Sequence, residues 1–178
     1  MVEQEEPKID MNLYSRQIGT FGMEAMGKLV KLKVLIIGQR GLGVETAKNL
    51  ILAGPNSVTL YDPTTVAIED LTSNFYLSEK DVGKVSRAEA SLLQLSELNP
   101  YVKSNVVSEF SPADVKNYSL VCITENLSSF AKLVEINEAC RAANVGFVLS
   151  ETLGAAGYAF VDYGNDHKIF DFDGEPTK

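Results

Sequence analysis

Residues 33–54, KVLIIGQRGLGVETAKNLILAG, and residues 57–62, SVTLYD, decide the fold of this chain. An apolar run ends at a glycine-rich turn, a helical pattern follows, and a second apolar run ends in an acid. This order is typical of a strand–turn–helix–strand unit of the dinucleotide-binding type, with Asp62 about 20 residues beyond the turn. In such a unit the helix amino terminus offers free N–H groups to a phosphate.

The rest of the chain repeats the alternation of strands and helices. Apolar runs predict further strands at 105–107, 120–123 and 146–149. Helical spacing predicts helices at about 42–52, 84–98 and 130–140, and one at 12–32 in two pieces broken near 19–22. Residues 158–163 and 168–172, joined by 164–166, predict a terminal β-hairpin. We therefore expect an α/β, Rossmann-like, doubly wound and mostly parallel sheet with helices on both faces.

Composition sets the class of protein. The chain has 178 residues, 45% of them apolar, which suits one domain with a true core. Its net charge of −8 argues against a nucleic-acid partner, and no run of about 20 apolar residues predicts a membrane span. The acid lies at the ends, with −3 in residues 1–10 and −3 in 159–178, which indicates solvated termini. The acidic start is the opposite of a secretory signal.

The cysteines and the histidine offer little chemistry. Cys122 and Cys140 lack a C-x-x-C partner, so we expect a reduced protein of the cytoplasm and nucleus. His167 is the only histidine and follows Gly164 in a predicted turn, which disfavours a histidine-based triad.

The glycine-rich turn departs from the G-x-G-x-x-G pattern. Its three positions are Gly38, Arg40 and Gly43, and Gly41 falls between them without restoring the second glycine. Arg40 could neutralise a phosphate, or it could fill the place where the backbone should approach one. We favour the second reading, because backbone access is what the missing glycine provides. Gly38 and Gly43 would then be structural residues.

With these residues in view, the chain resembles the ThiF/MoeB-like adenylating fold of ubiquitin-activating enzymes and their bacterial sulfur-carrier relatives. It is most similar to the first, inactive adenylation half of the eukaryotic enzymes. The resemblance covers residues 13–172, with an acidic tail at 1–12 and a tail at 173–178 that would lead to a further domain. Its motifs are LYSRQ at 13–17, the glycine loop, EDLTSNFYLSEKDVGK at 69–84 and RAEASLLQLSELNPYV at 87–102.

The resemblance implies a ligase reaction that this segment does not perform alone. Active members use ATP and magnesium to transfer AMP to the carboxyl terminus of a carrier protein. Where they have a small loop residue, a second acid, a phosphate-binding arginine and an asparagine, this chain has Arg40, Thr64, Ser73 and Asp70. We expect no ATP, magnesium or other cofactor to be bound by this segment, although the full enzyme would use both.

Three charged residues match family positions. Lys84 stands where an active half has a phosphate-contacting lysine, and Glu125 stands near the magnesium-binding aspartate. By themselves they read as a surface lysine and a solvated loop acid. Arg16 by itself reads as a surface arginine, but the resemblance makes it an arginine finger supplied in trans to ATP on the partner half.

The expected partners are the active adenylation half and ubiquitin, with self-association possible when the chain is isolated. One alternative is the regulatory subunit of an activating enzyme for another, SUMO-type modifier. A second is an NAD-dependent oxidoreductase domain, although the chain lacks a second domain and a catalytic His or Tyr-Lys pair.

Overall fold

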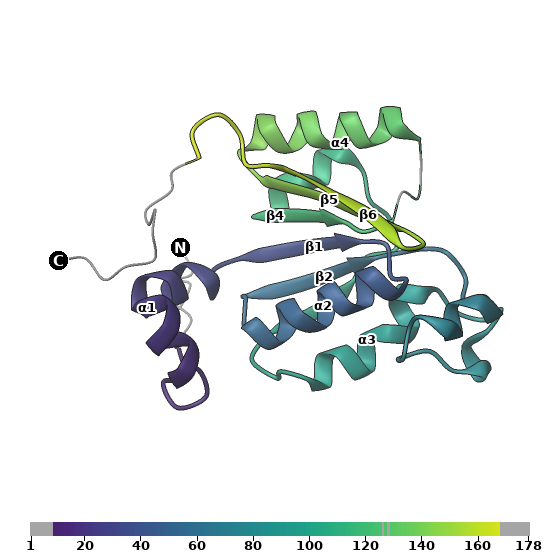
Figure 1. Ribbon diagram of the computed structural model, residues 1–178, viewed down its shortest axis with the longest axis horizontal. Coiled ribbons are helices and arrows are strands. Elements are labelled where there is room, and N and C mark those ends of the chain that lie inside the picture. The colour runs from purple at the N-terminus through teal and green to yellow at the C-terminus, as the bar shows by residue number, and fades with distance from the viewer. Residues whose placement is uncertain (1–8, 126, 128, 168–178) are drawn as a thin grey trace, which may run out of the picture.

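The computed structural model describes residues 9–125, 127 and 129–167, which build a six-stranded sheet in the order β3-β2-β1-β4-β5-β6 (Figure 1). The strands are β1 Lys33–Ile37, β2 Ser57–Tyr61, β3 Lys103–Val106, β4 Leu120–Ile123, β5 Gly146–Leu153 and β6 Ala156–Asp162. The helices are α1 Ser15–Leu29, α2 Gly41–Ala53, α3 Arg87–Glu97 and α4 Phe130–Ala143, with 3-10 turns η1 Ile68–Thr72, η2 Glu79–Asp81 and η3 Pro112–Asn117. The first five strands pair in parallel and β6 pairs antiparallel with β5, so the predicted fold class is confirmed.

Helices cover both faces of the sheet, as Figure 1 shows with α4 on one side and α2 and α3 on the other. The central strand β1 divides its side chains between the two layers. Val34 and Ile36 pack with the α2 and α3 side chains, whereas Leu35 and Ile37 pack with those of α4. This double burial explains why the strand reads as a continuous apolar run.

The helix α1 stands apart from these layers. It kinks at Gly22, whose φ of +78° breaks the helix where the sequence predicts two pieces. Met26 is its only buried residue, and Phe21 and Met23 beside the kink are exposed. None of the helices in the described ranges is long and apolar enough to span a membrane.

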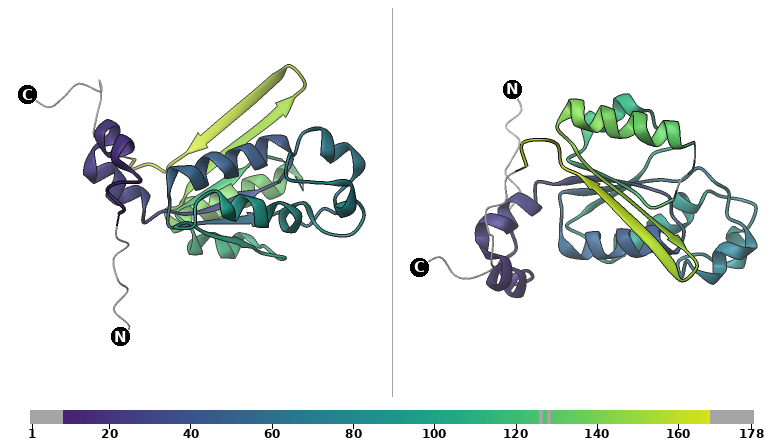
Figure 2. Two further views of the ribbon diagram at one scale, coloured as in Figure 1. Left: turned by 90° about the horizontal axis from the view of Figure 1, so that it is seen from below. Right: turned by 45° about the horizontal axis from the view of Figure 1, so that its top comes forward.

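Two strands differ from the sequence prediction. The third strand is Lys103–Val106 rather than 105–107. An antiparallel hairpin is present, but it joins β5 to β6 through a turn at Gly154; the predicted pairing of 158–163 with 168–172 is not tested, because 168–172 lies outside the described residues. β5 pairs with β4 only as far as Leu149, and the rest projects with β6 beyond the sheet (Figure 2). Without a helix over it, this part of β5 needs no apolar run, so the sequence signal stops too early.

Both cysteines are buried. Cys122 lies in β4 and Cys140 in α4, on opposite faces of the sheet. Burial raises the pKa of the Cys122 thiol to about 12 and, together with the Asp162 charge, that of Cys140 to about 11. Since the thiolate is the nucleophilic form, both side chains behave as small apolar residues.

Candidate functional site

The glycine-rich loop joins β1 to α2 at the carboxyl edge of the sheet, where the strand order runs from β1 to β2 on one side and to β4 on the other. Open α/β sheets bind ligands at such a switch point. Gly38 has a φ of +93°, and a Cβ there would lie 2.7 Å from Glu125 Cβ. A Cβ on Gly43 would overlap the Gly38 carbonyl oxygen, and one on Gly41 would lie 3.0 Å from Ser73 Cβ. The shape of the loop itself therefore requires Gly38 and Gly43.

Asp62, at the end of β2, is turned into the protein. Its side chain is 1% exposed, and it accepts hydrogen bonds from the backbone N–H groups of Gln39, at 2.8 Å, and Thr64, at 3.0 Å. Asp62, at the end of the second strand, thus holds the glycine loop in place through its hydrogen bond from the Gln39 N–H.

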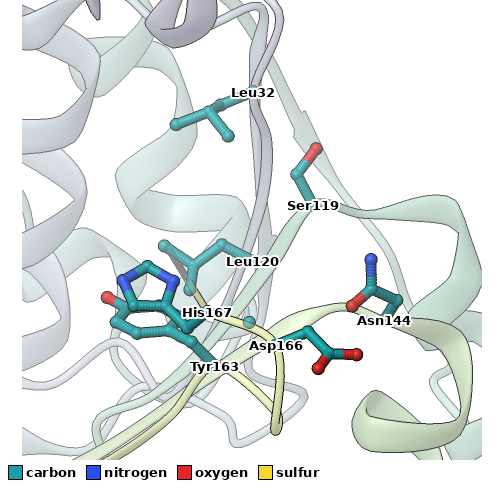
Figure 3. Close-up of a pocket in the computed structure, with 8 residues that line it drawn as sticks. Leu32, Ser119, Leu120, Asn144, Tyr163, Asp166 and His167 are labelled. Carbon is teal, nitrogen blue, oxygen red and sulfur yellow. The ribbon is translucent and has the colours of Figure 1, made fainter. Parts of the chain in front are cut away.

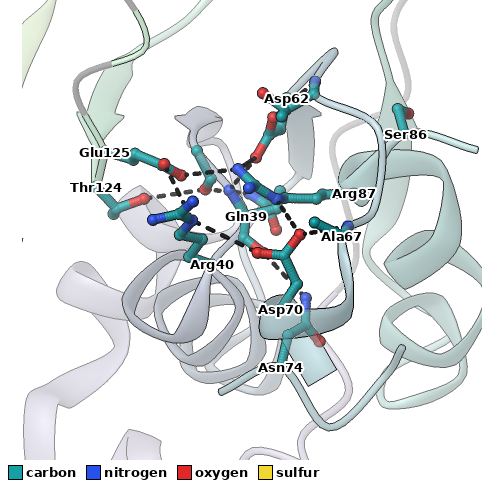
Figure 4. A network of polar contacts seen from close by, with 12 residues as sticks. Gln39, Arg40, Asp62, Ala67, Asp70, Asn74, Ser86, Arg87, Thr124 and Glu125 are labelled. Atoms are coloured by element: carbon teal, nitrogen blue, oxygen red, sulfur yellow. Dashed lines mark hydrogen bonds and ion pairs between the residues drawn. The ribbon is translucent and has the colours of Figure 1, made fainter. Parts of the chain in front are cut away.

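Arg87, at the start of α3, is the buried cation of this edge (Figure 4). Its Nε donates to Asp70 Oδ2 at 2.7 Å, and its Nη1 lies 3.3 Å from Glu125 Oε2 and 3.6 Å from Asp62 Oδ2. The sequence reasoning missed this residue. Its signal is the four-residue spacing of Arg87, Ser91 and Leu95, which puts the arginine on the buried face of α3.

Arg40 contacts two of these three carboxylates, those of Asp70 and Glu125. It precedes α2, and its side chain remains 52% exposed. Its Nε lies 3.2 Å from Glu125 Oε1 and 3.5 Å from Asp70 Oδ1, so its positive end is directed into the protein at the loop (Figure 4).

We call these five residues the carboxylate–arginine cluster: Arg40, Asp62, Asp70, Arg87 and Glu125. It holds three carboxylates against two guanidinium groups. Burial raises the pKa of Glu125 above its ordinary value, an effect that the charges of Arg40 and Arg87 oppose. Burial by itself would lower the pKa of Arg87, but the hydrogen bond to Asp70 and the nearby carboxylates raise it overall. Both arginines are therefore held by carboxylates of the cluster.

Asn74 ties the loop to α3 beneath the cluster. Its Nδ2 donates to the Gln39 carbonyl oxygen at 2.9 Å and to Ser91 Oγ at 3.1 Å, while its Oδ1 accepts from the Tyr76 N–H. These bonds fix the segment after η1 against the loop.

The remaining candidates lie elsewhere or serve other contacts. Lys84 follows η2 with an exposed side chain, and its N–H donates to the Asp81 carbonyl oxygen. Glu125 contacts arginines, and the described residues contain no group of three or more His, Cys, Asp or Glu side chains arranged to hold a metal ion. Arg16 is exposed in the first turn of α1, and this helix lies beyond the amino end of β1, whereas the glycine loop follows the carboxyl end of β1 (Figure 1).

A pocket of about 500 Å³ lies at the amino edge of the sheet, away from the cluster (Figure 3). Ser119, Asp166 and His167 line it, and the His167 ring stacks on Tyr163 with centroids 4.8 Å apart. The Ser119 hydroxyl accepts from the Lys33 N–H, and within the described ranges no hydrogen bond links Ser119, Asp166 and His167. A nucleophile needs a base within hydrogen-bond reach, so this trio does not form a triad.

Comparisons with known proteins agree with this fold. The family model described as "ThiF family" matches residues 14–176. A ubiquitin-activating enzyme E1 1 of Schizosaccharomyces pombe is 45% identical over 166 residues, covering 93% of this chain and 16% of that protein. A ubiquitin-like modifier-activating enzyme 1 of Dictyostelium discoideum is 42% identical over 173 residues, covering 97% and 17%.

Among solved structures, E. coli MccB with succinimide superposes with a TM-score of 0.74 at 20% identity, covering 90% of this chain and 51% of that one. That likeness concerns the fold. The chain spans about a sixth of the length of the curated relatives it matches. The chain belongs to the ThiF family.

Proposed function

We propose that this chain is the non-catalytic adenylation half of a ubiquitin-activating enzyme, which docks on an active half and assists ATP-dependent adenylation of ubiquitin. The similarity to ubiquitin-activating enzymes supports the pathway. The observation that carries the non-catalytic role is the carboxylate–arginine cluster, because its charges fill the edge where this kind of sheet receives a ligand.

The cluster does not fit a nucleotide phosphate. Asp70 and Glu125 engage Arg87 and the Nε of Arg40 at 2.7 to 3.5 Å, so a phosphate would compete with these carboxylates for both guanidinium groups. Two like unit charges about 4 Å apart repel by roughly 4 kcal/mol at an effective dielectric constant of 20. Three carboxylates against two guanidinium groups leave the cluster with a formal charge of −1, so this edge is unfavourable for an anion such as ATP.

The position of Arg16 supports a role at a phosphate site on a second adenylation domain. The amino and carboxyl edges of a five-residue strand such as β1 are about 15 Å apart. Arg16 lies beyond the amino edge and the glycine loop at the carboxyl edge, so this arginine does not serve its own loop. Its planar, permanently charged fork suits phosphate oxygens on the active half.

The projecting β5–β6 hairpin supplies a surface for docking. It exposes large apolar side chains on both faces, with Phe160 49%, Val161 50% and Leu153 62% exposed. A two-stranded ribbon is marginally stable in water by itself, and grouped apolar side chains mark protein contacts. We assign the active adenylation half as the protein that covers this hairpin.

Calorimetric titration tests the non-catalytic role. We expect no heat of binding from ATP–magnesium at millimolar concentration, nor from NAD or NADH. Micromolar ATP binding would contradict the proposal, and tight binding of a nicotinamide cofactor would favour the oxidoreductase alternative.

A chimera tests the trans role. This chain would replace the matching 166 residues of the fission-yeast enzyme, and ATP–pyrophosphate exchange would be measured with ubiquitin. Loss of a charge-assisted contact in the transition state predicts at least about a tenfold fall in rate for Arg16→Ala. The control Lys116→Ala, an exposed cation on η3, should leave the rate unchanged. An unchanged rate for Arg16→Ala would refute the assignment, and a SUMO-type modifier in place of ubiquitin tests the remaining alternative.

A further inference from the structure

The helix that carries Arg16 has few contacts of its own. Among the residues of α1, Met26 alone is buried, and the kink at Gly22 separates it from the first turn. The side chain of Ser15 and that of Arg16 are exposed. Gln17 and Ile18 are half-buried, and the orientation of the first turn comes from them together with the residues that precede it.

Tyr14 anchors that turn. It immediately precedes α1, it is 6% exposed, and its carbonyl oxygen accepts the Ile18 N–H at 2.9 Å. Its ring lies on Gly54, the residue that ends α2, where a Cβ would come within 2.7 Å of the ring. Gly54 also has a φ of +91°, so glycine is required there both for the end of α2 and for the tyrosine.

Asn99 fixes the Tyr14 ring from the far side of the chain. Its Nδ2 donates to the Tyr14 hydroxyl at 2.9 Å and to the Ile51 carbonyl oxygen at 3.0 Å, and its Oδ1 accepts the Tyr101 N–H at 3.1 Å. Asn99 is 5% exposed. One buried amide thus connects the start of α1 to the end of α2 and to the segment before β3.

Asp10 completes the attachment. Its Oδ1 accepts the N–H groups of Asn12 and Leu13 at 2.9 and 3.0 Å, and its Oδ2 accepts the Tyr101 hydroxyl at 3.2 Å. Its carbonyl oxygen accepts the Tyr14 N–H at 3.0 Å. Residues 10–14 are thus attached to the rest of the chain by two side-chain hydrogen bonds. The bond between Tyr14 and Asn99 is buried, and the bond between Asp10 and Tyr101 is exposed.

We infer that Asp10, Tyr14, Asn99 and Tyr101 form a clamp that positions Arg16, with the Tyr14–Asn99 hydrogen bond as its buried part. The inference rests on the proposed function, because Arg16 needs a fixed direction only if it reaches a ligand on another fold. Tyr14 and Asn99 are thus positioning residues. Tyr14 lies two residues before Arg16, and Asn99 lies 85 residues after Tyr14. A hydrogen bond between distant parts of the chain therefore fixes the direction of the Arg16 side chain.

Tyr14→Phe is the sharpest test, because it keeps the ring on Gly54 and removes only the hydroxyl. Loss of one hydrogen bond predicts about a fivefold increase in hydrogen exchange at the amide of residue 14 and at that of Ile18, which donate to the carbonyl oxygens of Asp10 and of residue 14. The matched control is Tyr118→Phe, which removes a half-buried tyrosine hydroxyl on a different part of the chain. It should leave exchange at the amides of Tyr14 and Ile18 unchanged. Unchanged exchange in Tyr14→Phe would overturn the clamp, whatever the enzyme assay gives.

The chimera then separates the clamp from the proposed function. We expect Tyr14→Phe to lower kcat/KM for ATP about fivefold with the KM for ubiquitin unchanged, and Tyr14→Phe with Arg16→Ala to be no slower than Arg16→Ala alone. Additive losses would contradict positioning through Arg16. If Arg16→Ala has no effect while exchange still rises in Tyr14→Phe, the trans role fails and the clamp is only structural. If Arg16→Ala is slow and Tyr14→Phe is normal, the positioning role fails and the trans role survives.

Discussion

Replacing Arg87 with methionine should show how much the carboxylate–arginine cluster stabilises the fold. Methionine keeps much of the buried volume and removes the charge. Asp70, 2% exposed, loses its 2.7 Å partner and keeps the Ala67 N–H and the longer 3.5 Å contact with Arg40 Nε, whereas Asp62 keeps two backbone donors. Breaking a buried ion pair from one side costs about 3–5 kcal/mol. Because one carboxylate bears most of the loss, we expect the lower end, about 3 kcal/mol.

The assay is urea unfolding followed by far-UV circular dichroism, with thermal unfolding as a second measure. A loss of about 3 kcal/mol corresponds to a fall of roughly 6–12 °C in Tm for a chain of this size. The double variant Arg87→Met with Asp70→Asn removes the uncompensated charge and should recover at least about 1.5 kcal/mol of that loss. A loss below about 1 kcal/mol, or a double variant less stable than Arg87→Met, would refute the reasoning.

Other properties of the chain follow from the same structure. Gly54→Ala should lower the free energy of unfolding by more than about 2 kcal/mol, because backbone strain adds to overlap with the Tyr14 ring. Gly83→Ala, with φ +72° and open space around it, should lower it by about 1 kcal/mol. Equal losses in thermal unfolding would contradict this. Burial raises the pKa of Glu125, so the folded chain binds its proton more tightly than the unfolded chain. Its contribution to stability is therefore full below pH 4.5 and is lost as the pH rises through the folded pKa. Between pH 4 and 7, the free energy of unfolding of Glu125→Gln should rise relative to that of the natural chain. A difference in unfolding free energy that does not change with pH would contradict this. Cys122 and Cys140, with pKa values of about 12 and 11, should react with iodoacetamide at pH 8 far more slowly in the folded chain than in urea, and equal rates by mass spectrometry would show that they are accessible.

The central part of the fold could be predicted because its signals are local. The apolar run of β1 stops at Gly38, and Gly38 and Gly43 mark a turn that only glycine can make. The cluster could not be predicted in the same way, because Asp70 and Arg87 lie on separate elements and each alone resembles a surface charge. Only the buried face of α3 hints that Arg87 points inward.

The candidate site shows the same division. That Arg40 stands where a glycine is expected is visible in the sequence, but the direction of its side chain depends on Glu125 from the β4–α4 connection. The hairpin was only half predictable, since the second part of β5 lacks an apolar pattern and pairs with β6 alone. Tyr14 sits within a recognised motif, yet its role depends on Asn99, which is remote in the chain.

The cluster also bears on the order in which the chain folds. Its members come from the loop after β1, the end of β2, η1, α3 and the segment after β4, so the whole cluster, with the contacts of Glu125 to both arginines, can form only when β1, β2 and β4 already lie side by side. Contacts between such distant segments form late, and late contacts govern the rate of unfolding more than the rate of folding. In stopped-flow measurements, Arg87→Met should therefore accelerate unfolding and leave the folding rate almost unchanged. The ion pairs at this edge of the sheet would then determine how slowly the folded chain unfolds.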